Sequence, residues 1–214
     1  MTQPDVALTD YALAVECSVF TYLLVPARGS AFLSIWFIIF FVSIALASAL
    51  GGTVHGFYED PASSGQRILW PLTLLAIGLT ALSGINIGAL IHFEASVVRA
   101  ISRIAAVVFF VYCVVALFIA PTFLVAIIDY LPAALFLGWV FLQAYRRTQR
   151  PAFVLGFSGI CVTLVAAGVQ QARLGLHPRY FNHNAAYHVL QAIGLFMLFI
   201  TARDSGARSE VSQP

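Results

Sequence analysis

The sequence predicts an all-α membrane protein, a seven-transmembrane helix bundle in one domain. Hydrophobic residues make up 61% of its 214 residues and charged residues only 9%, whereas a soluble domain carries roughly 25% charged residues. The mean hydropathy is +0.92. The apolar residues gather in seven stretches, and crossing a bilayer takes about 20 residues. We therefore expect an integral, multi-pass membrane protein with essentially no soluble domain.

The seven expected spans follow one another with short connections. The first span is short, starting at Asp10 or earlier, and only Ala120 and Pro121 separate the fourth from the fifth. The chain then forms a single transmembrane domain over residues 1–214, with an N-tail of residues 1–9 and a C-tail of residues 203–214. In chain order the expected spans are Asp10–Pro26, Ser30–Tyr58, Ile68–His92, Val98–Ala120, Thr122–Tyr145, Pro151–Gln171 and Phe181–Ala202.

The arginines predict the orientation of the bundle, because cytoplasmic loops carry an excess of basic residues. All 11 basic residues are Arg, and the absence of Lys excludes a retinal Schiff base. With seven spans, three arginines fall on the side of the N-terminus and eight on the other side. We expect the N-terminus outside and the C-terminus in the cytoplasm, in a bacterial inner membrane. The two sets are Arg67, Arg173, Arg179 and Arg28, Arg99, Arg103, Arg146, Arg147, Arg150, Arg203, Arg208.

This orientation places most polar residues of the spans in their outer half. Unsatisfied polar groups in lipid cost several kcal/mol each, so such a group of residues indicates a function. We expect a polar cavity that opens toward the outer face and is closed below by apolar packing. The residues are Asp10, Glu16, His55, Tyr58, Glu59, Asp60, Asp129, Tyr130, Gln170, Gln171, His177, His183, Asn184, Tyr187, His188 and Gln191.

Helical spacing predicts which side chains of the last span face the interior. Asn184, His188 and Gln191 fall at i, i+4 and i+7 and form one stripe. His183 lies about 140° from His188 on a regular helix. It can therefore join this stripe only from an irregular turn before the helix.

The second span carries a matching face. Ser48 and His55 are seven residues apart and share this face, and Gly51 and Gly52 between them allow another helix to approach closely. His55 is therefore expected at the same depth as the histidines of the last span.

Three histidines near the outer face indicate a zinc site. Zinc is often held by three protein ligands and a water, and His55, His183 and His188 are the candidate ligands. Such a bound water can attack a carbonyl. Asp129 is a candidate fourth ligand, hydrogen-bond acceptor or general base, and Glu16 is an alternative in each role. The other interpretation makes these histidines interfacial residues and Asp129 a protonated contact between helices.

Two short segments carry a family resemblance. GGTVHGFYED in the second span and FNHNAAYHVLQAIGLFMLF in the seventh resemble the CREST superfamily of membrane hydrolases, which includes alkaline ceramidases and adiponectin-type receptors. The resemblance implies zinc bound by His55 and by a histidine pair that ends at His188, and hydrolysis of lipid amides. The chain departs from the family where Asn184 takes the first place of the pair and Gly51 the place of a serine. The acidic residue near the start of the third span has no counterpart.

The leading hypothesis is a zinc-dependent intramembrane hydrolase of a lipid amide or ester, with its site near the outer leaflet. Its expected partner is membrane lipid, as surroundings and as substrate, and no nucleic acid is expected. A non-catalytic metal- or lipid-binding or sensing protein is the main alternative. Less favoured are a haem protein with His55 and His188 as axial ligands and a proton-coupled transporter that uses Glu16, Asp129 and His55. The oligomeric state stays open.

Overall fold

The computed structural model describes residues 1–25, 31–177 and 180–207. These residues form seven helices that are long and apolar enough to cross a membrane. The predicted bounds at Pro26 and Ser30, and the arginines Arg28, Arg179 and Arg208, lie outside them. The helices are α1 (Pro4–Leu24), α2 (Ala31–Phe57), α3 (Ser64–His92), α4 (Ala95–Val114) with the π-helical turn η1 (Val115–Ile119), α5 (Phe123–Thr148), α6 (Pro151–Gln171) and α7 (His183–Ala207).

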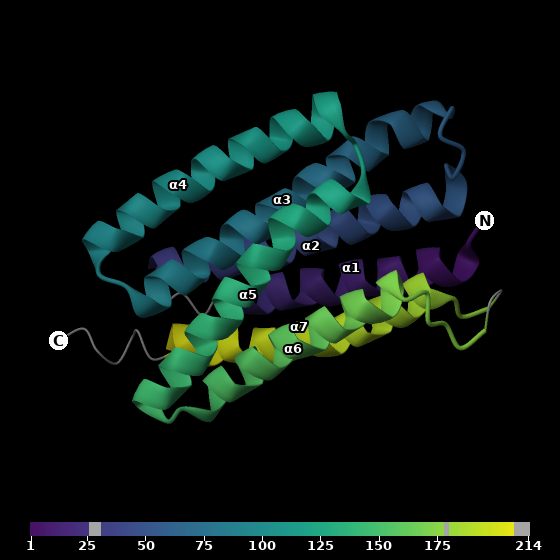
Figure 1. Ribbon diagram of the computed structural model, residues 1–214. Helices are drawn as coiled ribbons and strands as arrows, with labels where there is room; N and C mark the ends of the chain where they lie inside the picture. Colours follow the sequence, from purple (N-terminus) through teal and green to yellow (C-terminus); the bar gives the residue numbers. More distant parts are fainter. Residues whose placement is uncertain (26–30, 178–179, 208–214) are drawn as a thin grey trace.

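Six of these helices form a closed ring, and α4 lies outside it (Figure 1). Going round the ring, α1 packs against α2, α2 against α3, α3 against α5, α5 against α6, α6 against α7, and α7 against α1. The fourth helix packs mainly on α3. The first and last helices are thus neighbours, so that residues from opposite ends of the chain meet inside the ring.

Several helices are longer than the apolar stretches that predicted them. Helix α1 begins at Pro4, inside the expected N-tail, because proline suits the first turn of a helix. Helix α7 continues to Ala207, where Arg150 forms an ion pair with Asp204. Helix α6 has the predicted bounds, Pro151–Gln171. Polar residues at both ends of the chain therefore belong to helices rather than tails.

The apolar core fills one end of the ring, where α5 and α6 are joined. Phe20, Phe41 and Phe199 from three different helices are buried there. The rings of Phe20 and Phe199 stack at 4.3 Å, and Phe41 meets Phe20 edge to face at 5.4 Å. This packing of described residues closes that end of the ring with apolar side chains, as predicted.

Candidate functional site

A cavity of about 530 Å³ lies inside the ring, toward the end that holds the N-terminus. The predicted polar cavity is therefore present. Its two walls differ in chemistry. Helices α3 and α5 contribute mainly apolar side chains, apart from Thr73, Thr80 and Tyr130. The opposite wall, from α1, α2, α6 and α7, carries most of the polar side chains, which are Asp10, Ser48, His55, Thr163, Gln170, Gln171, Asn184, Tyr187, His188 and Gln191.

The cavity opens between α5 and α6. These two helices meet at their short connection and diverge toward the cavity end of the bundle (Figure 1). Gly168 on α6 and Leu131 on α5 both line the cavity and are also exposed. A Cβ added to Gly168 would meet no atom within 4 Å. Gln171, the last residue of α6, also lines the cavity and is exposed, so the cavity reaches the surface both at the side of the bundle and near the end of α6.

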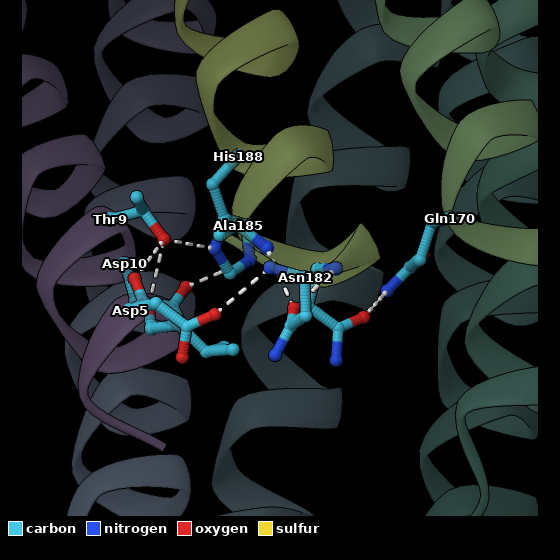
Figure 2. A network of polar contacts seen from close by, with 9 residues as sticks. Asp5, Thr9, Asp10, Gln170, Asn182, Ala185 and His188 are labelled. Carbon is cyan, nitrogen blue, oxygen red and sulfur yellow. Dashed lines mark hydrogen bonds and ion pairs between the residues drawn. The ribbon is translucent and has the colours of Figure 1, made fainter. Parts of the chain in front are cut away.

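The imidazole of His188 is held from both sides by α1 (Figure 2). Its Nε2 lies 3.2 Å from Oδ1 of Asp10, and its Nδ1 lies 3.0 Å from Oγ1 of Thr9. The Thr9 hydroxyl lies 2.9 Å from each of the carbonyl oxygens of Asp5 and Val6. Because this hydroxyl has one proton and carbonyls only accept, Nδ1–H donates to Thr9 when Thr9 donates to its own helix. One proton is then shared between His188 and Asp10 in a buried pair.

The close approach of α1 to α2 depends on a glycine. A Cβ on Gly52 would lie 2.9 Å from Cβ of Asp10 and 3.2 Å from the carbonyl oxygen of Ala7. Any larger side chain at this position would push α1 outward and carry Asp10 with it. The prediction that Gly51 and Gly52 admit another helix is confirmed, and the helix they admit is the one that carries the carboxylate.

The start of α7 is fixed by a cap that also binds α1. Oδ1 of Asn182 accepts hydrogen bonds from the N–H groups of Asn184 (2.8 Å) and Ala185 (3.2 Å), which are otherwise unpaired at a helix N-terminus. The N–H of Asn182 donates to Oδ2 of Asp5 at 3.0 Å (Figure 2). Together with the contacts of His188, this cap sets the rotation of α7 relative to α1.

The structure brings together two of the three predicted zinc ligands. His55 and His188 line the same cavity. Asn184 and Gln191 line it as well, which confirms the predicted stripe on α7. His183 is the first residue of α7 and does not line the cavity. The described residues contain no group of three or more His, Cys, Asp or Glu side chains that could hold a metal ion. The zinc site therefore stays a prediction that no such group in the described residues supports.

The two predicted proton carriers lie away from the cavity. Neither Asp129 nor Glu16 is among its lining residues, and each has one buried carboxylate oxygen without a hydrogen-bond partner in the described part of the chain. The carboxylate that contacts His188 belongs to Asp10. Sequence reasoning made Asp10 the first residue of the first span, at the same expected depth as the histidines, but gave it no role. The spacing of Asp5 and Thr9, one helical turn apart just before it, was the available signal that α1 begins earlier.

The chain belongs to the family DUF6962, which is described as a family of unknown function and whose model matches residues 6–207. No curated protein and no solved structure matches the chain at a significant level. The family covers all seven helices and assigns no activity, so the function must be argued from the cavity.

Proposed function

We propose that this protein binds a lipid-like amphiphile inside its helical bundle. The observation that carries the proposal is the cavity between α1, α2, α3, α5, α6 and α7, which has a polar wall and an apolar wall in one space. Its volume of about 530 Å³ lies within the range of roughly 300–1,000 Å³ typical of ligand sites. An amphiphile matches both walls at once, with its head group on α1, α2, α6 and α7 and its chain on α3 and α5.

The sideways opening supports entry from the bilayer. An acyl chain that passes between α5 and α6, beside Gly168 and Leu131, moves from one apolar medium to another and never crosses water. Its head group exchanges water for the polar side chains of the inner wall, which avoids the cost of burying unpaired polar groups. This is the non-catalytic, lipid-binding alternative of the sequence analysis, and no step of it uses a metal.

A bulky side chain placed in the opening of the cavity tests this proposal. Gly168→Phe places a large ring in open space, whereas Gly168→Ala adds one methyl group that meets no neighbour within 4 Å. Native mass spectrometry after gentle extraction is expected to show bound lipid in the wild type and in Gly168→Ala, and a loss of that lipid in Gly168→Phe. Lipid-free wild-type protein, or equal lipid in both variants, would contradict the proposal.

Hydrolysis of a lipid ester or amide is the second candidate function. It is favoured by the position of Asp10, which lines the cavity while it shares a proton with His188. A carboxylate in that position can take a proton from a water that attacks a carbonyl group on the polar wall. Turnover of long-chain esters and amides would then be lost in Asp10→Asn while lipid binding is kept. Wild-type protein that binds lipid but turns over none of these compounds would leave the binding function alone.

We also propose that the cavity end of the bundle faces the outside of the cell, with the C-terminus in the cytoplasm. The support is the division of the arginines, three on the side of the N-terminus and eight on the other. In a background without the native cysteines, Asp60→Cys between α2 and α3 should react with an impermeant maleimide on intact cells. Glu94→Cys between α3 and α4 should react only after lysis. The reverse pattern would invert the orientation.

A further inference from the structure

We infer that the ligand is a single-chain amphiphile with an uncharged, hydrogen-bonding head group. This inference rests on the proposed binding function and names the chemical class of the ligand. Three properties of the cavity carry it: its volume, the charges on its wall and the hydrogen-bonding groups at its polar side.

The volume limits the ligand to one acyl chain. Sites of roughly 300–1,000 Å³ each hold one drug-sized ligand, and this cavity of about 530 Å³ lies in that range. One long chain with a small head group is of that size. A lipid with two chains of the same length exceeds it about twofold, and its second chain would have to stay in the opening between α5 and α6.

The wall carries no permanent positive charge to match an anionic head group. Among the described residues no arginine lines the cavity, and the chain contains no lysine. The only acidic group on the wall, Asp10, is already paired with His188 at 3.2 Å. A phosphate or carboxylate would therefore be buried beside a carboxylate without a compensating cation, which is strongly unfavourable. A permanent cation would have to compete with His188 for Asp10.

The polar wall offers donors and acceptors in equal measure. Four carboxamides line it, and each presents both an N–H₂ donor and a carbonyl acceptor. One of them, Gln170, donates from Nε2 to Oδ1 of Asn184 at 3.1 Å (Figure 2). Hydroxyl and amide groups also donate and accept, so they can join this network without leaving a member unpaired, whereas an ester group only accepts. The four carboxamides are Gln170, Gln171, Asn184 and Gln191.

The fluorescence of Trp70 reports ligand binding, because its side chain lines the cavity. In a Trp36→Phe/Trp139→Phe background it is the sole tryptophan of the chain. Bromine atoms at the middle of an acyl chain quench tryptophan fluorescence on contact. Three probes carry the same dibromostearoyl chain and differ in the charge of the head group or in the number of chains. They are a monoacylglycerol, its lysophosphatidate and the diacylglycerol. Each is titrated into lipid-stripped protein, with and without Gly168→Phe.

The monoacylglycerol is expected to quench Trp70 with an apparent Kd at least ten-fold lower than that of either other probe. Gly168→Phe should raise this Kd ten-fold or more, while Val165→Phe, at an exposed position of α6 outside the cavity lining, should leave it unchanged. Equal or tighter binding of the lysophosphatidate or the diacylglycerol, sensitive to Gly168→Phe, would overturn this inference and leave the proposed function standing. Absence of quenching by all three probes, or quenching that Gly168→Phe does not reduce, would overturn both.

Discussion

Removal of the carboxylate of Asp10 is expected to destabilise the bundle far more than removal of the carboxylate of Asp204. Both carboxylates pair with a basic side chain, Asp10 with His188 and Asp204 with Arg150. The two pairs differ in burial. The side chains of the first pair are 7% and 9% exposed, whereas those of the second are 32% and 26% exposed. The chain thus contains its own control for the effect of burial.

The expected magnitudes follow from this difference. The first pair shares one proton, so its contact of 3.2 Å between Nε2 and Oδ1 is a buried hydrogen bond, and a buried partner left without that bond is costly. Asp10→Ala leaves the buried imidazole without this partner, so it should lower the free energy of unfolding by about 1–3 kcal/mol. Asp204→Ala breaks a partly exposed pair, and its effect should stay below about 1 kcal/mol.

Double-mutant cycles separate the interaction energy of each pair from the cost of removing a single side chain. Unfolding in mixed micelles with increasing SDS, followed by circular dichroism, gives the free energy for each single variant and for the double variants with His188→Ala and Arg150→Ala. The coupling energy should exceed about 1.5 kcal/mol for the buried pair and stay below about 1 kcal/mol for the other. Equal losses in Asp10→Ala and Asp204→Ala, or no coupling between Asp10 and His188, would refute the reasoning.

Four further outcomes are expected. Gly52→Leu should destabilise the protein by about 1–3 kcal/mol through overpacking against α1, while Gly168→Leu at the open position should not, as measured by the same SDS titration. Phe20→Ala in the buried aromatic cluster should cost about 3–5 kcal/mol, and the half-exposed Phe196→Ala less than about 1 kcal/mol. Asn182→Ala should cost about 0.5–2 kcal/mol and speed hydrogen exchange in the first turn of α7. Stripping bound lipid with detergent should lower the Tm, and adding lipid to about 100 times its Kd should restore about 2.7 kcal/mol.

The number of helices and the depth of the polar residues were predictable from the sequence. Long apolar stretches fix both, because a helix rises 1.5 Å per residue and must cross a layer of known thickness. Helix α6 has the predicted bounds because Pro151 starts it and polar Gln170 and Gln171 end it. The start of α1 was missed because Asp5 and Asp10 lower the local hydropathy, although both carboxylates are satisfied by contacts with α7.

The rotation of each helix about its own axis was only partly predictable. On α7 the polar stripe from Asn184 to Gln191 indicated the inner face, and the structure places it on the cavity. Asp129 is an isolated polar residue of its helix, and Glu16 lies among scattered polar residues of α1, so no regular polar stripe indicates which way either one faces. They were suggested as partners of the histidines only because the sequence predicts the same depth in the membrane for them. The actual partner, Asp10, depends on a contact between α1 and Gly52 that becomes visible only in three dimensions.

The size of the cavity is the physical reason to expect a resident ligand. An empty void of about 530 Å³ would cost on the order of 13 kcal/mol at about 24 cal/mol per Å³. That is as much as the whole folding free energy of a typical domain, about 5–15 kcal/mol. Water can fill only the part of a cavity where polar groups hold each molecule, and the wall that includes Trp70, Ile77 and Phe123 offers few such groups. An acyl chain covers that wall while its head group takes the place of water opposite. We therefore expect lipid to occupy this space.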